Sequence, residues 1–195
     1  MASASAFGIT VCGIVELGQH VALGATHVLS ILDPEYPVPE AFGQYGEHVR
    51  LERRFHDIIA PTPGLTPPGE VDITAVLALG KSLQEERAPR LLVHCHAGIS
   101  RSTAAMALIL AQAMPEVPAA DILAMVHGIR EKAWPNLRMI EMGDARLGRG
   151  GSLVEAAFGL YRLQLDRRPH IAEYMCGEGR AREVEGGRLR PALSL

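Results

Sequence analysis

Residues 90–114 contain two consecutive segments that each need to be surrounded by other parts of a fold. The run RLLVHC (90–95) has the length and composition of a buried strand. The stretch STAAMALILAQAM (102–114) follows almost at once and is nearly apolar all round, as is typical of a helix with neighbours on every side. A buried strand that leads through a short loop into a buried helix predicts the central unit of an α/β fold.

The rest of the chain supplies elements that could surround this unit. Three further runs have the character of strands: ITVCGI (9–14), HVLSIL (27–32) and the more polar HVRLERRF (48–55). Helices are expected at residues 73–83, at 122–129, and from about residues 137 and 152. Early strands interleaved with helices, followed by helices only, predict an α/β sandwich with a mostly parallel sheet.

Composition limits the number of domains and the partners. A chain of 195 residues with 48% hydrophobic residues is expected to form one domain, which we place at residues 1–170. The last twenty residues, CGEGRAREVEGGRLRPALSL, are rich in Gly, Arg and Glu and predict a flexible C-terminal tail over 171–195. A formal charge of −3 gives no reason to expect nucleic acid or an anionic membrane as a partner.

Cysteine usage and the N-terminus indicate where such a chain works. Three cysteines are too few and too scattered for a disulfide framework, which favours a reducing, cytoplasmic location. The N-terminal MASASAFGITVCGI lacks the basic region of a secretory signal and is more typical of a first strand. No apolar stretch approaches the roughly 20 residues that a membrane-spanning helix requires.

The junction between the buried strand and the buried helix carries the chemistry. It reads His94-Cys95-His96-Ala97-Gly98-Ile99-Ser100-Arg101-Ser102. The first N–H groups of a helix have no partner within the helix, and the helix dipole adds partial positive charge there. A short loop that enters this terminus can therefore wrap several N–H groups around one dianion, and Gly98 permits the backbone bend that this requires.

Three side chains of this segment suit phosphoryl transfer. A cysteine in such a positive environment is favoured as the thiolate, and Cys95 stands at the start of the loop. The planar fork of Arg101 matches two phosphoryl oxygens at once. Ser102 can donate to the sulfur and make it a better leaving group. These residues predict attack by Cys95 on a bound phosphorus atom to form a phosphocysteine, with no metal and no cofactor required.

This segment resembles the His-Cys-x5-Arg-Ser/Thr signature of the cysteine-dependent protein tyrosine phosphatases, and in particular their compact dual-specificity branch. The match includes His94, Cys95, Gly98, Arg101 and Ser102, and a looser resemblance extends from about residue 8 to 165. The resemblance implies a phosphotyrosine-phosphatase-like sandwich with a central, mostly parallel sheet of four or five strands flanked by helices. It also implies that residues 96–101 bind the phosphate and that His94 braces the loop.

The family also uses an aspartate on a loop upstream of the cysteine to protonate the leaving oxygen, and this chain offers two main candidates. Asp57 stands where the polar strand meets the Pro- and Gly-rich APTPGLTPPGE (60–70). Asp72 stands at the start of a helix, where an acidic residue also serves as a cap. We prefer Asp57 as the acid, with Asp72 as the alternative and Asp33 as a distant third.

Two further motifs have competing interpretations. Trp134-Pro135-Asn136 resembles the Pro-Asn pair with which dual-specificity-type phosphatases steady the phosphate loop, but Asn136 could equally be a plain helix cap. His94 and His96 form a His-x-His pair, but no second cluster at ligand spacing accompanies them, so we expect no zinc site. Cys12 and Cys176 are expected to be a core residue and a tail residue.

The sequence therefore predicts a metal-independent phosphatase that hydrolyses phosphomonoesters through a phosphocysteine. The loop has none of the extra lysines of the family's lipid phosphatases, which favours phosphotyrosine, or phosphoserine and phosphothreonine, on a protein. One alternative is a pseudophosphatase that binds phosphoproteins without turnover. Another is a sulfur carrier or an arsenate reductase, which would need a persulfide or a resolving thiol that Cys12 and Cys176 have no evident route to supply.

Overall fold

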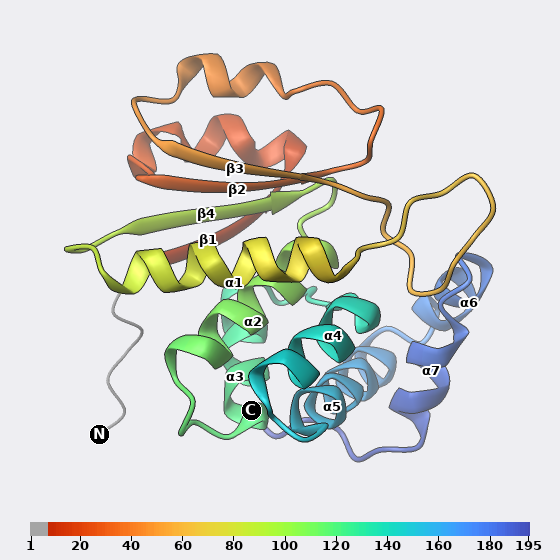
Figure 1. Cartoon of the computed structure of the whole chain (residues 1–195). Helices are drawn as coiled ribbons and strands as arrows, with labels where there is room; N and C mark the ends of the chain where they lie inside the picture. Colours follow the sequence, from red (N-terminus) through yellow and green to blue (C-terminus); the bar gives the residue numbers. More distant parts are fainter. Residues whose placement is uncertain (1–7) are drawn as a thin grey trace.

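The computed structural model describes residues 8–195 and is built around one parallel sheet. Its strands are β1 (Gly8–Gly13), β2 (His27–Leu32), β3 (Val49–Arg54) and β4 (Arg90–Cys95). They lie in the order β1-β4-β2-β3, and every neighbouring pair is parallel (Figure 1). The prediction of a mostly parallel sheet of four or five strands is confirmed, and all carboxyl ends of the strands meet at one edge. The expectation for the first seven residues lies outside the described part of the chain.

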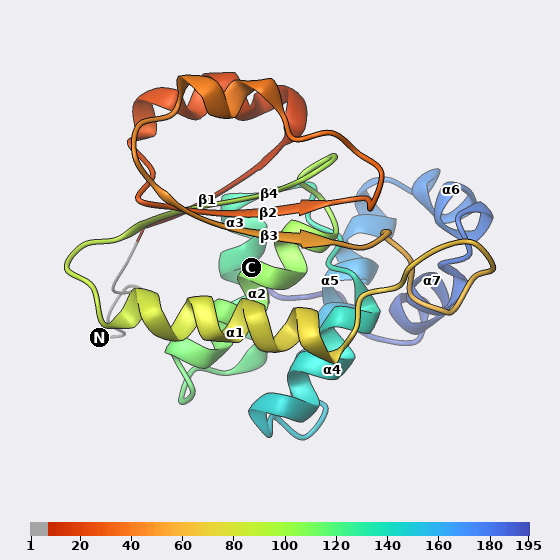
Figure 2. The same cartoon turned by 45° about the horizontal axis from the view of Figure 1, so that its top comes forward.

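The two faces of the sheet are covered differently, as Figures 1 and 2 show. Two 3-10 segments, η1 (Ile14–Leu23) and η2 (Glu40–Gln44), cover one face over a small apolar cluster that includes Cys12, Val28 and Leu92. The main core lies on the other face. It is covered by the helices α1 (Glu70–Gln84), α2 (Arg101–Ala113), α3 (Ala119–Ile129), α4 (Leu137–Leu147) and α5 (Ser152–Arg167).

Helix α2 lies in the middle of this main core. Residues Arg101–Ala111 of the helix are all buried, since α1, α3 and α4 pack around it and β4 leads directly into it. This arrangement is what the all-round apolar sequence predicts. It fixes the N-terminus of α2 at the carboxyl edge of the sheet, so the connection from Cys95 to Arg101 has little freedom to move.

The C-terminal segment, residues 171–195, differs from the flexible tail that its composition suggested. It carries two helices, α6 (Ile171–Gly177) and α7 (Ala181–Arg188), and Figure 1 shows them beside the loop that follows β3. Arg180 and Glu183 are buried, and the N–H of Leu193 donates to the Gly159 carbonyl at 2.9 Å. Polar composition misleads here because the two buried charges neutralise each other. Within residues 8–195, no helix has the length and apolarity to cross a bilayer.

Candidate active site

The cysteine loop, residues 95–101, turns its carbonyl groups away from its own centre. Each carbonyl from residue 96 to 100 accepts a hydrogen bond from outside the loop: His96 from Ile14 N (2.9 Å), Ala97 and Gly98 from Arg130 (3.0 Å each), Ile99 from Trp134 N (2.9 Å) and Ser100 from Ala104 N (2.9 Å). The N–H groups of residues 97–100 donate to no acceptor in the described part of the chain. Because the carbonyls point outward, the N–H groups of residues 97–100 can donate to an anion at the centre of the loop. The first-turn N–H groups of α2, which have no partner within the helix, can join them.

Gly98 lets the loop lie directly on the end of β1. Its φ of +67° is in the left-handed region. A Cβ on this residue would lie 2.4 Å from the carbonyl carbon of Cys12 and 2.6 Å from the nitrogen of Gly13. Both observations require glycine, as the sequence analysis expected for a bend that a side chain would obstruct.

Arg130, at the end of α3, holds the outer side of the loop, a role that sequence reasoning missed. Its Nε and Nη2 donate to the Gly98 and Ala97 carbonyls, and its Nη1 and Nη2 donate to Glu16 at 3.0 and 2.8 Å. Glu16 in turn accepts from Gly13 N at 2.6 Å, and its pKa is lowered chiefly by the hydrogen bond from Arg130. The Arg130–Glu16 pair therefore ties the cysteine loop to the end of β1.

Cys95, Ser102 and Arg101 meet at the bottom of the loop. The Cys95 Sγ lies 3.2 Å from the Ser102 Oγ, and both side chains are buried. The Arg101 Nη1 donates at 2.6 Å to the Asp33 carboxylate and at 2.6 Å to the Phe55 carbonyl. The Arg101 Nε is buried and has no partner among the described residues. One edge of the guanidinium is thus anchored, while a second donor remains free for a ligand.

Asp57 lies in the loop after β3, residues 55–69, and is held by polar groups from three elements. Its Oδ1 accepts from Ser100 Oγ (2.7 Å) and from Asn136 Nδ2 (2.8 Å), and its Oδ2 lies 3.2 Å from Arg180 Nη1. Burial alone would raise the pKa of Asp57, but Arg180, Arg101 and the two hydrogen bonds outweigh it and lower the pKa below its usual value. The carboxylate is therefore ionised at neutral pH while the cavity is empty.

Asp72 has a different position and different partners. Its Oδ1 accepts from Arg53 at 2.6 and 2.8 Å, and its Oδ2 accepts from Gly69 N at the start of α1. It does not line the cavity described next, whereas Asp57 does. The geometry is that of a helix cap with an ion pair.

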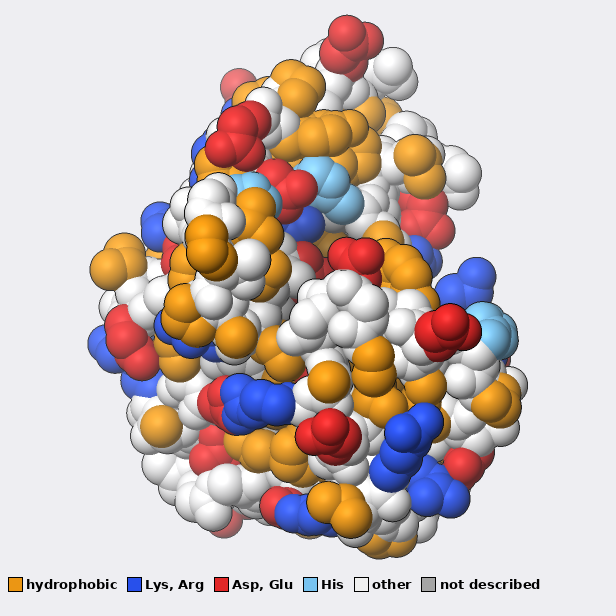
Figure 3. Space-filling view, turned by 90° about the vertical axis from the view of Figure 1, so that its right-hand side faces the viewer, with side chains coloured by type: hydrophobic (Ala, Val, Ile, Leu, Met, Phe, Trp, Pro, Cys, Tyr) orange, Lys and Arg blue, Asp and Glu red, His pale blue; other side chains and the backbone are white. Residues whose placement is uncertain are grey.

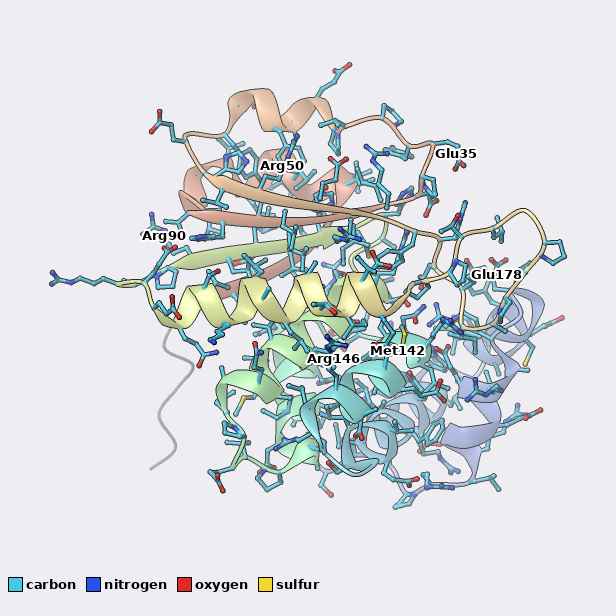
Figure 4. The ribbon with its side chains drawn as sticks, in the orientation of Figure 1. Glu35, Arg50, Arg90, Met142, Arg146 and Glu178 are labelled. Atoms are coloured by element: carbon cyan, nitrogen blue, oxygen red, sulfur yellow. The ribbon has the colours of Figure 1, made fainter. Side chains whose placement is uncertain are left out.

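A cavity of about 420 Å³ opens over the cysteine loop. Its floor includes Cys95 and Arg101, and its rim comes from the loop after β3 and from α6. Apolar side chains form much of the wall: Ile58, Leu65, Ile99, Trp134, Ile171 and Met175. Figure 3 looks onto this side of the molecule and shows histidine and charged side chains around a hollow. Figure 4 places Glu178, which also lines the cavity, beside the loop after β3 and far from Arg90.

The histidines and the remaining cysteines of the described residues form no metal centre. His94 is buried, its Nε2 lies 2.7 Å from Ser30 Oγ, and burial lowers its pKa to about 4, so the ring is neutral at pH 7. Burial, followed by Glu16, raises the pKa of the Cys12 thiol to about 12. Cys176 is exposed. Within residues 8–195, no group of three or more His, Cys, Asp and Glu side chains is placed to hold a metal ion.

Comparisons with known proteins agree with this geometry. The family model for protein-tyrosine phosphatase matches residues 64–139, which include the whole cysteine loop. No curated protein matches the sequence. Among solved structures, human DUSP28 is similar with 17% identity and a TM-score of 0.54, over 75% of this chain and 94% of that one. The predicted resemblance to the protein tyrosine phosphatases is supported by the family-model match over the cysteine loop, and the fold is shared with DUSP28.

Two further solved structures share this dual-specificity-type fold. The human tyrosine phosphatase-like serine/threonine/tyrosine-interacting protein has 20% identity and a TM-score of 0.55, over 73% of this chain and 93% of that one. The Yvh1 phosphatase domain from Chaetomium thermophilum has 17% identity and a TM-score of 0.51, over 78% of this chain and 96% of that one. At these identities the likeness establishes the fold, an α/β sandwich with helices flanking a parallel sheet.

The phosphatase-type loop brings together most of the residues that the sequence singled out. Cys95 and residues 96–101 form one loop, Ser102 of α2 lies beside Cys95, and Asp57 accepts a hydrogen bond from Ser100 of this loop. Asn136 caps α4, since its Oδ1 accepts from Met139 N, and its backbone N–H rather than its side chain donates to the Ser100 carbonyl of the cysteine loop. His94 contacts Ser30 of β2.

Two charged residues of the site were missed in the sequence analysis, and a third, Asp33, was assigned a different role. Arg130 and Arg180 come from the end of α3 and from the C-terminal segment, and neither belongs to a motif. Asp33 was considered only as the third candidate for the acid, but its carboxylate accepts from Arg101 and its N–H donates to His96 Nε2 at 3.2 Å. The only available signal for Asp33 was its place directly after β2, because side chains at that edge face the site.

Proposed function

We propose that this chain is a metal-independent phosphatase that hydrolyses phosphomonoesters of tyrosine, and of serine or threonine, through a phosphocysteine at Cys95. The observation that carries the proposal is the cysteine loop. The carbonyls of residues 96–100 are bonded outward. The N–H groups of residues 97–100 and the buried Arg101 Nε have no partner in the part of the chain that the structure describes. A cradle of donors that converges on a buried sulfur suits a tetrahedral dianion directly above that sulfur.

The first step would form the phosphocysteine. The loop amides and Arg101 bind the three terminal phosphoryl oxygens, and the Cys95 sulfur attacks phosphorus as the bond to the ester oxygen breaks. Asp57 gives its proton to the leaving oxygen, so an alcohol or a phenol departs rather than an anion. Binding of a dianion close to Asp57 favours the protonated carboxyl, since like charges disfavour ionisation.

The second step would return the enzyme to its starting state. Asp57, now ionised, takes a proton from a water molecule while the water oxygen attacks phosphorus, and the phosphorus–sulfur bond breaks. Ser102 Oγ, 3.2 Å from Cys95 Sγ, donates to the sulfur that departs. The products are inorganic phosphate and the dephosphorylated alcohol, and water supplies the oxygen.

Hydrolysis of p-nitrophenyl phosphate in EDTA tests this proposal. We expect turnover by the wild type, with none for Cys95→Ser and a large loss for Arg101→Ala. Cys176→Ser is the matched control, because Cys176 is exposed and its loss should leave turnover unchanged. A protein adduct of phosphate trapped by acid quench in the wild type and absent in Cys95→Ser would identify the intermediate. Equal rates for the wild type and Cys95→Ser would refute the proposal.

A phosphoprotein-binding module without turnover is the second candidate function. The observation that favours it is the ionised, firmly held Asp57 carboxylate, which makes a poor proton donor. One of the similar structures is itself described as a phosphatase-like interacting protein. Phosphopeptide binding in EDTA that depends on Arg101, with no phosphate released over the pH range 5–8, would select this candidate.

A further inference from the structure

Arg180 reaches the site from a part of the chain that no motif includes. It stands between α6 and α7, its side chain is 5% exposed, and its Nη1 lies 3.2 Å from the Asp57 Oδ2. Figure 1 shows α6 and α7 beside the loop after β3 that carries Asp57. The C-terminal segment thus places a buried positive charge beside Oδ2 of Asp57, whereas Ser100 and Asn136 donate to Oδ1.

The guanidinium of Arg180 is itself fixed by a buried carboxylate. Its Nε and Nη2 donate to the two Glu183 oxygens at 2.7 Å each, and Glu183 has no exposed surface. Glu183 also accepts from Trp134 Nε1 at 2.6 Å and from Leu137 N at 3.0 Å. A bidentate pair of this kind has little freedom, so the remaining nitrogen of Arg180 points at Asp57 in a set direction.

The same support reaches the cysteine loop. The backbone N–H of Trp134 donates to the Ile99 carbonyl, while the Trp134 indole donates to Glu183. One residue therefore connects the phosphate cradle to the group that holds Arg180. The position of Asp57 relative to the cysteine loop is therefore set in part by contacts that lead through Arg180 to Trp134.

Resting on the function proposed above, we propose that Arg180 is a positioning residue that holds the Asp57 carboxyl over the cysteine loop, so that the C-terminal segment completes the acid–base half of the site. It acts through Asp57. Its second effect is electrostatic, because its charge favours the ionised form of Asp57, which is the form that the water-activating step requires. The C-terminal segment then contributes to the site through Arg180 and Glu183.

Several charged or titratable groups act on Asp57 from the elements packed around it. They are Arg180 from the C-terminal segment, with Glu183 behind it, Arg101 from α2, His96 from the cysteine loop and Tyr161 from α5. Burial alone would lower the pKa of Arg180, but Asp57 and Glu183 outweigh it and raise that pKa, so Arg180 stays charged at every accessible pH. The counter-ion of Arg101 is Asp33. Arg180 instead pairs with Asp57 as well as with Glu183.

Three variants separate this role from simple structural support. Arg180→Lys keeps the charge. Arg180→Met combined with Glu183→Gln removes it without leaving a lone buried carboxylate, and keeps an acceptor for Trp134 or Leu137. Arg182→Met is the matched control, because Arg182 lies two residues further along the chain in α7, is 57% exposed and pairs with Glu141. For each protein, kcat/KM is measured against pH with p-nitrophenyl phosphate and with phenyl phosphate, whose leaving group depends more on the acid.

We expect a shift in the pH profile of kcat/KM, which a general loss of structure would not produce. Without Arg180, burial raises the pKa of Asp57, so the basic limb of the kcat/KM profile moves to higher pH in the double variant. The same variant loses about 10- to 100-fold on phenyl phosphate, because a displaced acid is inefficient, and less on p-nitrophenyl phosphate. Arg180→Lys restores most of both properties, and Arg182→Met matches the wild type.

Two outcomes overturn the inference, and they differ in what else they overturn. A wild type that turns over, with an unmoved basic limb and equal losses on both substrates in the double variant, refutes the role of Arg180 alone. A wild type without turnover refutes the proposed function and this inference with it. The first comparison requires a double variant that is fully folded by circular dichroism. Where it is not folded, equal losses of kcat/KM on both substrates in Arg180→Lys refute the role of Arg180.

Discussion

Replacing Gly98 by alanine tests whether the cysteine loop is held by its close approach to β1. Two features oppose a side chain here: the φ of +67° and the Cβ position 2.4 Å from the Cys12 carbonyl carbon. Carbon atoms in contact normally lie about 3.5–4.0 Å apart. The loop or the end of β1 therefore has to move by roughly 1 Å to admit one methyl group.

The expected loss of stability follows from these two features. The left-handed conformation costs a residue with a Cβ about 1–2 kcal/mol. Forcing a methyl group into a packed site costs about 1–3 kcal/mol more. Together they lower the free energy of unfolding by about 2–5 kcal/mol, which lowers Tm by roughly 4–20 °C in a domain of this size.

Gly148→Ala is the matched control for the backbone contribution. Gly148 ends α4 with a φ of +65°, and a Cβ there would meet no atom within 4 Å. Its replacement should cost only the conformational part, about 1–2 kcal/mol, and leave catalysis unchanged. The difference in Tm between the two variants measures the close approach of Gly98 to Cys12.

Thermal unfolding followed by circular dichroism and turnover of p-nitrophenyl phosphate are the two measurements. We expect kcat/KM of Gly98→Ala to fall about 100-fold, because a shift of 1 Å in a positioning element has effects of that size. Equal Tm losses in Gly98→Ala and Gly148→Ala, with kcat/KM of the former within threefold of the wild type, would refute the argument that backbone contact sets the loop.

Two further predictions concern residues beside the loop. Asp72→Ala should destabilise the protein by about 1–2 kcal/mol, because it removes the cap of α1 and the partner of Arg53, and should leave the pH profile of kcat/KM unchanged; an altered profile would make Asp72 the acid. Arg130→Met should weaken inhibition by inorganic phosphate and lower kcat/KM about 10-fold or more, because the Gly98 carbonyl and Glu16 lose their donor; phosphate inhibition at the wild-type level would show that the loop holds its shape alone.

The sequence was most informative where one local pattern dictates one structure. The strands at 27–32 and 90–95 match β2 and β4, because short apolar runs of that length have few other solutions in a soluble domain. The buried α2 follows from its all-round apolar surface. The cysteine loop is set by its neighbours in sequence, so its place at the carboxyl edge of β4 could be predicted together with its residues.

Groups that reach the site from distant elements could not be predicted in this way. Arg130 lies 33 residues from Ala97 in sequence, and Arg180 meets Asp57 only because α6 and α7 fold back onto the loop after β3. A polar, Gly-rich segment is normally disordered because it buries too little apolar surface. Here the Arg180–Glu183 pair is buried against Trp134, and this pairing of opposite charges holds a segment in place that composition alone suggested would be flexible.

The pairing of charges around the empty cavity explains how the site can be rigid before a ligand arrives. An isolated buried guanidinium is expensive, so each arginine of the cavity needs a counter-charge, and Asp33 and Glu183 supply it to Arg101 and Arg180. Each carboxylate leaves one nitrogen of its arginine unused. In Arg180 this nitrogen, Nη1, lies beside Asp57, and in Arg101 the Nε has no partner among the described residues. The direction of each donor is thus set in advance. A phosphoryl dianion then meets fixed dipoles, which do not have to reorganise as charge develops in the reaction.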